Sequence, residues 1–543
     1  MTQSPLMITA ALPYANGDIH LGHLVEYIQA DIAARFARSQ GRETLYLCGS
    51  DAHGTPIMLK AAENNESPEA MTKRVRETQL ADLNAFHVAF DNFHTTHSPE
   101  NQAIVNEMYA SLKANGHIIK KTISQAYDEE HQMFLPDRYV RGQCPKCGAP
   151  DQYGDNCEQC GASYDPTDLV DPRSTLSGKT PIHKDAEHVF LALEPMRDFL
   201  TQWLAGDALP PHVANKLKEW FEEELRPWDI SRNAPYFGFP IPGEDDAYFY
   251  VWMDAPIGYI ASFKHLADQT GLDMERYWGK DSDVTLYHVI GKDIAYFHGL
   301  FWPAVLNACG KRLPNKLFVH GYLTLNGEKM SKSRGTFITA QRYLKHLNPD
   351  CLRYYYAAKL NTSPDDIDLN LEDFRFRVNA DLVGKYINIA SRCAGFLRKH
   401  FDNTLSAELD DMDLWQACIG AKNEIADCYH AMDYARAIRH IMSVADRINQ
   451  YIDHHKPWAL AKENASNPKV QAICSMGIQL FRVLSIYLAP VIPSIAESVK
   501  TFLNVEHLDW ADLDEPLLGH RINAFRPLLG RITSEQTDTL IHE

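Results

Sequence analysis

The chain has 543 residues, of which 45% are apolar and 23% are charged, and its formal net charge is −18. The length predicts roughly three or four domains, and the composition is that of an ordinary globular protein. The negative charge excludes a general nucleic-acid binder, so any contact with RNA requires a local basic surface. Eleven cysteines spread along the chain indicate a reducing compartment, so we expect a cytoplasmic protein.

Targeting and membrane segments are not expected. Residues 1–17 have no basic beginning of the kind that a signal peptide shows. The most apolar late stretch, Phe481–Ala496, contains Arg482 and two prolines, which argues against a spanning helix.

The first fifty residues predict one strand–helix–strand unit. An apolar run over residues 6–12 has strand length, and turn residues follow it. Apolar residues then recur every three or four positions, which predicts a helix from Leu21 that stops at Gly41. A second strand is predicted over residues 44–48.

His20 and His23 flank Gly22 where the first strand gives way to the helix. The first turn of a helix presents unpaired N–H groups and a partial positive charge, and α/β sheets bind ligands at such turns. Two imidazoles on one face there suit phosphate binding, although two such histidines taken alone are more often surface residues. The unit lacks G-x-G-x-x-G, which argues against a dehydrogenase-type dinucleotide site.

Asp51 directly follows the second predicted strand. A carboxylate there can reach a ligand and hold a substrate ammonium group. In a loop rich in Gly and Ser, a cap or turn role is the commoner alternative.

Four cysteines form two C-x-x-C pairs, Cys144 with Cys147 and Cys157 with Cys160. Four thiolates at this spacing predict one structural zinc ion, with redox thiols or a metal-free cluster as the alternative. Four cysteines close the coordination sphere, so this metal would hold an insertion in shape and take no part in catalysis.

Beyond residue 228 the chain is rich in aromatic residues, and a strand predicted over residues 284–290 feeds a helix through a glycine-bearing loop. A sheet that resumes after the cysteine region predicts a split α/β domain. The aromatic residues are either plain core or the walls of a small apolar pocket with polar tips. The pocket candidates are Tyr14, Trp252, Tyr259, His298 and Trp302.

A loop over residues 326–335 carries Lys329 and Lys332 between glycines. Flanking glycines suit a mobile lid, and a lysine is a point charge suited to polyphosphate oxygens. Such a loop is usually a solvated turn, but the upstream histidine pair makes a shared triphosphate site the better interpretation.

His20-Leu21-Gly22-His23 resembles the first signature of class I aminoacyl-tRNA synthetases, from whose commoner form it differs only at Leu21. Lys329-Met330-Ser331-Lys332-Ser333 matches the second signature, KMSKS. Residues 11–17, 51–55 and 254–259 and the placement of the cysteine pairs are similar to the methionyl-tRNA synthetase family, bacterial type with a four-cysteine zinc insertion. The resemblance covers nearly the whole chain.

The resemblance implies ATP-dependent activation of L-methionine to methionyl-adenylate with release of pyrophosphate, then transfer to the terminal adenosine of tRNA(Met), initiator tRNA included. It implies Mg²⁺ with ATP beside the structural zinc ion. The implied catalytic residues are His20, His23, Lys329 and Lys332. The implied ATP contacts are His20, Gly22, His23, Gly291, Asp293 and Lys332.

The implied methionine-binding residues are Ala11, Leu12, Tyr14, Asp51, Trp252, Ala255, Pro256, Tyr259, Ile294, His298 and Trp302. Asp51 would take the ammonium group, and the rings would pack against the polarizable thioether. Walls lined by rings also accept leucine, so methionine itself is inherited from the resemblance.

The last third is predicted to be helical, with long helical regions over residues 380–397 and 419–454. Pro457 requires the second region to end near His455. Residues 385–400 contain basic residues and no acid, which supplies a local basic surface. Trp458 is either core or free to stack on a base. The resemblance implies that the anticodon is read by Asn388, Arg392, Pro457 and Trp458.

The expected fold is α/β: a Rossmann-like parallel-sheet catalytic domain, split by a zinc-binding insertion and followed by a C-terminal α-helical bundle. The catalytic halves are expected at 1–115 and 230–319 and the insertion at 116–229, with the knuckle at about 138–163. A KMSKS/stem-contact region at 320–384 and a helical anticodon-binding domain at 385–543 follow. Because the chain ends without a C-terminal dimerisation domain, we expect a monomer, or a truncated form of a longer enzyme.

Two rival functions are weighed. A class I synthetase for valine, isoleucine, leucine or cysteine fits less well, because the insertion is short for an editing domain and the cysteine enzymes place zinc in the active site. A zinc-bearing RNA-binding protein without catalysis would have no use for Lys332.

Overall fold

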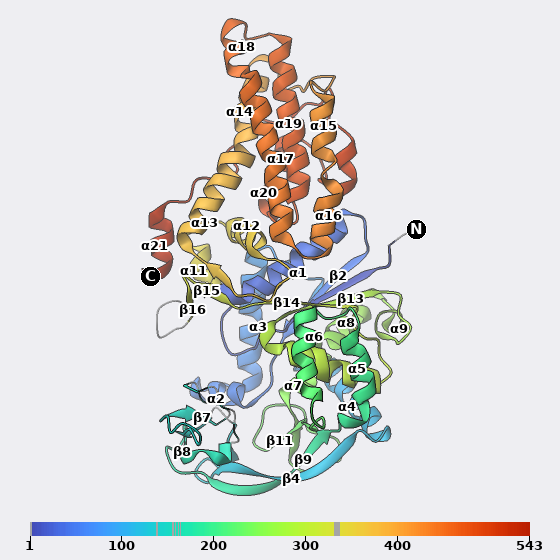
Figure 1. The fold of residues 1–543 in the computed structure, drawn as a ribbon, viewed down its shortest axis with the longest axis vertical. Coiled ribbons are helices and arrows are strands. Elements are labelled where there is room, and N and C mark those ends of the chain that lie inside the picture. The colour runs from blue at the N-terminus through green and yellow to red at the C-terminus, as the bar shows by residue number, and fades with distance from the viewer. Residues whose placement is uncertain are drawn as a thin grey trace.

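The computed structural model describes residues 3–542 except 137–138, 155–156, 158, 161, 163, 165 and 331–336. The molecule is elongated (Figure 1). An α/β body lies in the middle, a helical bundle forms one end, and a β-rich insertion forms the other.

A five-stranded parallel sheet in the order β14-β13-β1-β2-β3 forms the centre of the body. Its strands are β1 (Leu6–Ala10), β2 (Thr44–Ser50), β3 (Asn92–Thr95), β13 (Thr285–Gly291) and β14 (Lys316–His320). β1 pairs with β2 on one side and with β13 on the other. The strand order therefore reverses between β1 and β13, and parallel sheets open a ligand crevice at the carboxyl ends of such strands.

The two faces of β1 belong to different cores because successive side chains of a strand point to opposite faces. Leu6, Ile8 and Ala10 join the core that contains helix α1 (Leu21–Ser39). Met7 joins the core of α4 (Pro99–Ala114), α8 (Ile257–Thr270) and α10 (Trp302–Ala308). The remaining helices of the body are α2 (Thr55–Glu63), α3 (Pro68–Ala85), α7 (Val251–Asp254) and α9 (Met274–Trp278). The sheet is thus covered on both faces, as the split α/β prediction required.

The insertion interrupts the sheet between β3 and β13. Its long arms, β4 (Ile118–Asp128) and β9 (Ile182–Leu191), pair antiparallel and run along the lower edge of Figure 1. The other elements between these sheet strands are β5 (Met133–Phe134), β6 (Val140–Gln143), β7 (Gln152–Tyr153), β8 (Val170–Ser174), α5 (Arg197–Ala205), α6 (Pro211–Lys218), β10 (Trp228–Asp229), β11 (Ser231–Asn233) and β12 (Ala247–Phe249). The cysteine pairs lie beside the small β7-β6-β8 sheet.

After β14 a small sheet and helices lead into the bundle. The elements are β15 (Leu323–Leu325), β16 (Glu328–Lys329), α11 (Ala340–Leu344), α12 (Pro349–Lys359), β17 (Ile367–Leu369), α13 (Leu371–Arg377), a π-helix (Val378–Ile387), α14 (Asn388–His400), α15 (Met412–Ile419), α16 (Lys422–His430), α17 (Tyr434–His455), α18 (Pro457–Glu463), α19 (Pro468–Leu488), α20 (Pro493–Leu503) and α21 (Ser534–His542).

The predicted helical region over 419–454 is wrong in one respect, because the structure divides it into α16 and α17. Met432 adopts a left-handed backbone conformation with φ +53°. Asp433 then caps the new helix, its side chain accepting a hydrogen bond from the N–H of Arg436. A side-chain cap of this kind begins a helix afresh, which apolar periodicity cannot reveal. The predicted end near His455 is confirmed.

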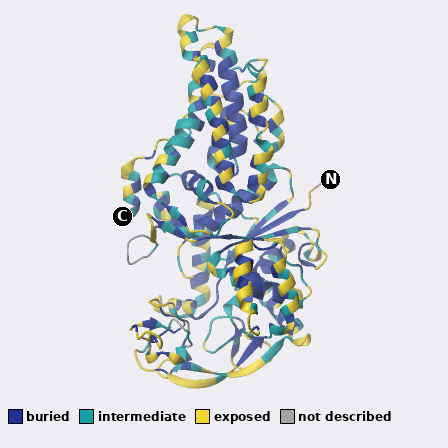
Figure 2. Cartoon of the chain, in the orientation of Figure 1, coloured by how far each residue is buried: buried dark blue, intermediate teal, exposed yellow. Residues whose placement is uncertain are grey.

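Helix α19 runs through the middle of the bundle and is almost entirely buried (Figure 2). Among the described residues it is the one helix long and apolar enough to cross a membrane, and 89% of its most apolar window is buried inside the protein. The centre of a helical bundle accounts for such a helix.

Candidate active site

The first turn of α1 is capped by the two predicted histidines. The Nδ1 atom of His20 accepts a hydrogen bond from the N–H of Gly22 at 3.1 Å, and Nδ1 of His23 accepts one from the N–H of His20 at 3.2 Å. A backbone N–H can only donate, so each neutral ring carries its proton on Nε2. The rings stack with their centroids 3.6 Å apart. Desolvation lowers the pKa of His23 to about 4, so this ring is a neutral N–H donor near pH 7.

The second signature meets the same turn from both of its ends. A Cβ atom placed on Gly22 would lie 2.7 Å from the Cε atom of Met330, so the end of this methionine lies directly against the glycine. On the other side Phe337 packs edge-on against His20, with centroids 4.9 Å apart. The carbonyl of Ile338 accepts a hydrogen bond from the first residue of α1 at 3.0 Å. Segments more than three hundred residues apart in sequence therefore converge here.

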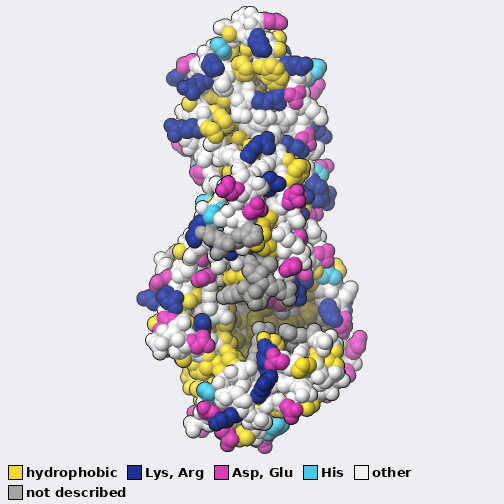
Figure 3. Space-filling model, turned by 90° about the vertical axis from the view of Figure 1, so that its left-hand side faces the viewer, with side chains coloured by type: hydrophobic (Ala, Val, Ile, Leu, Met, Phe, Trp, Pro, Cys, Tyr) yellow, Lys and Arg dark blue, Asp and Glu magenta, His cyan; other side chains and the backbone are white. Residues whose placement is uncertain are grey.

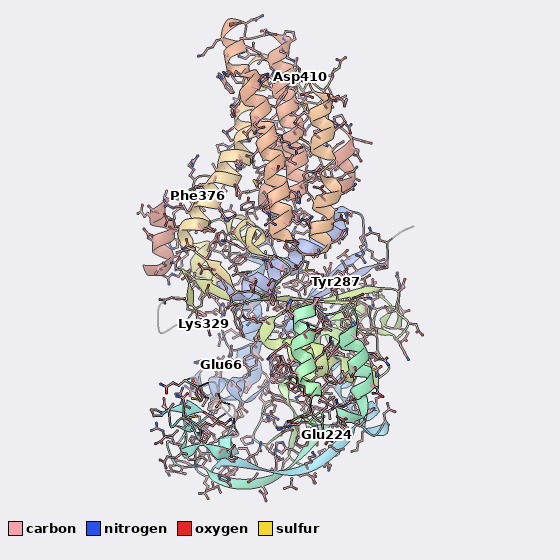
Figure 4. All side chains as sticks on the ribbon, viewed as in Figure 1. Glu66, Glu224, Tyr287, Lys329, Phe376 and Asp410 are labelled. Atoms are coloured by element: carbon pink, nitrogen blue, oxygen red, sulfur yellow. The ribbon has the colours of Figure 1, made fainter. Side chains whose placement is uncertain are left out.

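The second signature contributes two lysines to the candidate site. Lys329 is exposed at the end of β16, which pairs with β15 (Figure 4). Lys332 belongs to residues 331–336, outside the described part of the chain. In Figure 3 the face turned to the viewer is hollowed in its lower half, with hydrophobic side chains inside the hollow.

The predicted adenosine contacts follow β13. Gly291 ends this strand opposite His320 of β14, and a Cβ atom on Gly291 would lie 2.5 Å from a carboxylate oxygen of Asp293. Glu26 is a neighbour that the sequence analysis missed. It lies three residues after His23 on α1 and is buried, and it pairs with Nε2 of His320 at 3.3 Å. The spacing of three residues was the available signal, because it places Glu26 on the face of His23.

Asp51 is a buried carboxylate with an open acceptor. Its Oδ1 atom has no hydrogen-bond partner among the described residues. Its backbone bonds with the segment of Tyr14, donating to the carbonyl of Pro13 at 2.9 Å and accepting from the N–H of Ala15 at 2.7 Å. Burial and the neighbouring carboxylate of Asp254 raise the pKa of Asp51 well above its usual range. A cation placed here would restore the charged form.

Several predicted pocket residues form one connected cluster. The ring of His298 lies 3.1 Å from the carbonyl of Ile294 through Nδ1 and 2.9 Å from the hydroxyl of Tyr259 through Nε2. A carbonyl only accepts, so Nδ1 carries the proton and Tyr259 donates to Nε2. Trp302 packs edge-on against Tyr259 with centroids 6.4 Å apart. A Cβ atom on the glycine after Ile257 would lie 2.9 Å from Leu12, so this leucine closes on the start of α8.

The remaining pocket residues lie around this cluster. Trp252 stacks on Phe297, the residue before His298, at 4.1 Å. The hydroxyl of Tyr14 donates to the carbonyl of His53 at 2.9 Å, on the side of Asp51. The other predicted residues are Ala11, in the loop after β1, and Ala255 and Pro256, in the turn between α7 and α8.

The four predicted zinc ligands are brought together. Their sulfur atoms all lie within 4.8 Å of one another, with 3.8 Å between those of Cys144 and Cys160 and 3.6 Å between those of Cys147 and Cys157. A tetrahedral zinc ion with Zn–S bonds of about 2.3 Å separates its ligands by about 3.8 Å, so this set fits the metal. All eleven cysteines of the chain are free, so no disulfide competes for these thiols.

The predicted anticodon residues lie together at the far end of the bundle. The guanidinium of Arg392 lies over the ring of Trp458 at 4.6 Å and pairs with Asp453. Asn388 begins α14, one helical turn before Arg392, and Pro457 begins α18, where it is buried. Trp458 is half-buried, so it is neither a core residue nor a fully exposed ring.

A parallel sheet that reverses its order beside a histidine-capped helix, met there by a loop carrying KMSKS, defines the class I aminoacyl-tRNA synthetases. The family model described as "tRNA synthetases class I (M)" matches residues 6–394, and the chain belongs to this family. The model described as "Anticodon binding domain of methionyl tRNA ligase" matches residues 410–541.

Solved structures of one bacterial enzyme share the fold. The Mycobacterium tuberculosis methionyl-tRNA synthetase bound by methionyl-adenylate is 23% identical, with a TM-score of 0.81 over 97% of this chain and 100% of that one. A second adenylate complex is 24% identical with the same TM-score and the same coverage. The apo form is 22% identical, with a TM-score of 0.74 over 98% of this chain and 99% of that one.

Membership of the family settles the reaction. The chain is a methionine–tRNA ligase, which activates methionine with ATP and then charges tRNA. The rival synthetases and the non-catalytic RNA-binding protein are thereby excluded. Mg²⁺ accompanies ATP in this family, and the four-cysteine cluster could hold a zinc ion.

Proposed function

We propose that the first turn of α1 binds the triphosphate of ATP and that the KMSKS loop closes over it. His20 and His23 would donate Nε2–H groups to phosphate oxygens beside the positive end of the helix. Lys332 and Lys329 would hold the leaving pyrophosphate, and Mg²⁺ would be held mainly by the phosphates. The observation that carries this proposal is the contact of Met330 and Phe337 with the capped turn.

Adenosine would lie at the carboxyl end of β13, against Gly291 and Asp293. The main-chain turn after this strand allows close approach, and Glu26 buries a second carboxylate beside Asp293. The Oε1 atom of Glu26 has no partner among the described residues, so a ribose hydroxyl is a suitable donor for it.

Methionine would lie between Asp51 and the ring cluster, with its ammonium on Asp51 and its thioether among the rings. Rings of Tyr259, Trp302 and His298 suit a polarizable sulfur. The other members are those predicted: Ala11, Leu12, Tyr14, Trp252, Ala255, Pro256 and Ile294. The substrate carboxylate is then directed at the α-phosphorus.

The chemistry follows from positioning and charge stabilisation. The carboxylate of methionine is already ionised near pH 7, so its attack on the α-phosphorus needs no general base. One oxygen–phosphorus bond forms while the bond to the β-phosphate oxygen breaks, and the negative charge that develops on the phosphates is met by the histidine and lysine donors. A hydroxyl of the terminal adenosine of tRNA then attacks the carbonyl of the adenylate and releases AMP.

At the other end of the molecule, we propose that Asn388, Arg392, Pro457 and Trp458 read the anticodon. An arginine lying over a half-buried tryptophan leaves a flat, cationic surface on which a base can stack. The domain boundaries stated above remain our proposal, as do a monomeric enzyme in the cytoplasm and no membrane association.

ATP–pyrophosphate exchange tests the substrate assignment. Exchange is expected with methionine and much less with leucine, and exchange only with another amino acid would contradict it. Lys332→Ala is expected to lower the exchange rate by about 10²–10³, the effect of losing one transition-state donor. An unchanged rate would remove the loop from the mechanism.

A second experiment distinguishes the proposed anticodon site from the activation site. Trp458→Ala is expected to leave exchange unchanged and to weaken tRNA charging by about 1–3 kcal/mol, the free energy of one stacked base. Trp415→Phe, which alters a buried tryptophan of α15 in the same bundle, is the control and is expected to affect neither step. Equal loss of exchange and charging would show that Trp458 is structural.

A further inference from the structure

His288 contacts the methionine pocket from behind without belonging to the predicted set. It lies in the middle of β13, paired with Thr9 of β1, and its side chain is 0% exposed. Its ring stacks on Tyr259 at 5.0 Å and lies edge-on to His298 at 5.9 Å. Three rings of the proposed pocket, counting Trp302, therefore surround one buried imidazole.

Both nitrogen atoms of His288 are in use, and the donors determine the tautomer. The indole N–H of Trp302 lies 3.1 Å from Nε2 of His288, and an indole nitrogen can only donate. Nε2 is therefore the acceptor, so the proton is on Nδ1, which lies 2.5 Å from the hydroxyl oxygen of Thr9. The ring is a neutral bridge between a strand of the sheet and a wall of the pocket.

The hydrogen bond to His288 restrains the side chain of Trp302. The π-helix Phe297–Phe301 runs directly into α10, which Trp302 begins, so the backbone alone leaves the indole several rotamers. The bond to His288 selects one of them, because any other leaves a buried N–H without a partner. Tyr259, stacked on the same imidazole, is restrained with it.

We infer that His288 is a positioning residue for amino-acid selection, which sets the indole of Trp302 and the ring of Tyr259 through a tautomer held by Thr9. The inference rests on the methionine pocket proposed above. The proposed role is to discriminate between amino acids by the shape of their side chains, because the fixed rings determine which side chains fit between them. A pocket whose rings can move accepts leucine and norleucine more readily than a fixed one.

The matched variants are His288→Met and His288→Gln. Both replacements are unbranched and of similar length, but only glutamine keeps a strong acceptor for the indole N–H, because a thioether sulfur accepts weakly. A buried unsatisfied donor changes binding by about fivefold to a hundredfold. In ATP–pyrophosphate exchange, His288→Met is expected to raise KM for methionine by this factor and to lower the preference for methionine over norleucine. His288→Gln is expected to remain within about threefold of the original enzyme, and KM for ATP is expected to change by less than about twofold in both.

A spectroscopic signal reports the bond itself. In protein labelled with ¹⁵N-tryptophan, the indole signal that disappears in Trp302→Phe belongs to Trp302. We expect His288→Met to shift that signal toward the value of an unbonded indole and His288→Gln to restore it. A merely structural role would move several indole signals and would raise both KM values together, and that result would overturn the inference.

A second pair of variants serves if His288→Met fails to fold. Thr9→Val removes the acceptor for Nδ1 and frees the tautomer, so it is expected to change selectivity in the same direction, whereas Thr9→Ser keeps the hydroxyl and is expected to have no effect. Unchanged selectivity in Thr9→Val would overturn the inference. Trp302→Ala tells the two proposals apart: if it leaves KM for methionine unchanged, the pocket itself is wrong, and if it raises KM while His288→Met does not, only the role of His288 is wrong.

Discussion

Asp51 and Glu26 each bury a carboxylate oxygen that has no partner among the described residues. Leaving a buried polar group unsatisfied costs about 1–3 kcal/mol, and more for a charged group. A ligand can supply the missing partner, and the two carboxylates come from different parts of the site, Glu26 from α1 and Asp51 from the position directly after β2. These two open acceptors are the basis of the proposal that Asp51 binds an ammonium group and Glu26 a ribose hydroxyl.

The raised pKa of Asp51 gives methionine binding a dependence on pH. Burial and the nearby carboxylate of Asp254 favour the protonated form of Asp51 in the free enzyme. Asp254 itself pairs with the ring of His53. The substrate ammonium requires the ionised form, so binding releases a proton. The KM for methionine is therefore expected to fall as pH rises through the raised pKa of Asp51, because the ionised form that binds the ammonium becomes populated. Calorimetry in buffers of different ionisation enthalpy measures the released proton.

Asp51→Asn provides the control for this dependence. The amide cannot ionise, so the proton release is expected to disappear and the KM for methionine to rise by about 10² or more, since removing one partner of a buried charge pair costs about 2–5 kcal/mol. Asp281→Asn, at an exposed carboxylate before β13, is expected to change neither quantity. A pH profile unchanged by Asp51→Asn would assign the ammonium to another group.

Helix α1 joins two functions at its N-cap residue. His20 is the N-cap that satisfies a backbone donor of the first turn, and it is also a proposed phosphate donor. Short motifs of this kind are readable from sequence because a cap, a helix start and a glycine lie within four residues of one another. The motif does not show that Met330 and Phe337 contact it, because that contact depends on how the sheet and the loop are packed.

Two substitutions at His20 separate the cap from the phosphate donor. Asparagine is among the best N-cap residues, so His20→Asn is expected to keep the stability of the helix while losing the Nε2 donor, with an activation rate lower by about 10²–10³. His20→Ala loses both and is expected to lower the free energy of unfolding by about 0.5–2 kcal/mol in addition. Urea unfolding and ATP–pyrophosphate exchange measure the two effects. Normal exchange in His20→Asn would leave His20 with the cap alone.

The cysteine knuckle is a separate element whose folding is coupled to its metal. Structural zinc sites contribute apparent binding free energies of about 10–16 kcal/mol, so loss of a ligand is expected to unfold the knuckle. We expect about one zinc ion per chain by elemental analysis, and fewer in Cys147→Ser, with new protease cleavage confined to residues near 140–180. Cys309→Ser lies outside the cluster and should retain the metal. Full zinc content in Cys147→Ser would show that the metal is held elsewhere.

A buried arginine is among the contacts that join the helix α1 of the catalytic body to the bundle. Arg353 of α12 is 0% exposed and pairs with Asp31 of α1 at 2.6 Å. It also donates to the carbonyl of Val491 at 2.9 Å and to that of Pro490 at 3.0 Å, in the turn before α20. Burial opposes ionisation of Asp31, but Arg353 and Arg35 outweigh it and hold the pKa of Asp31 below its usual value. At the level of the whole molecule, Arg353 thus connects α1, which carries the first signature, to the turn before α20 in the bundle.

Removing this arginine alone is expected to be costly. Arg353→Leu leaves Asp31 buried without its main partner, which should lower the free energy of unfolding by about 3–5 kcal/mol in urea. The double variant Asp31→Leu/Arg353→Leu removes both charges and is expected to recover most of that loss, since apolar pairs of similar volume often replace buried ion pairs well. A double variant as unstable as the single one would show that the carbonyl contacts carry the stability.

The sequence alone determined what depends on neighbours along the chain: the alternation of strands and helices, the start of a helix just after His20, the cysteine spacing and the end of α17 before Pro457. Each follows from local geometry, because periodicity, caps and turns involve residues within a few positions. Tertiary structure decided the rest: Glu26 against His320, Met330 on Gly22, and the indole of Trp302 on His288. These contacts either join residues far apart along the chain or depend on the rotamer of a side chain. Only the packing of the sheet and the helices determines which of them form. The break between α16 and α17 is local, at Met432 and the Asp433 cap, but the apolar pattern continues across it and conceals it from periodicity.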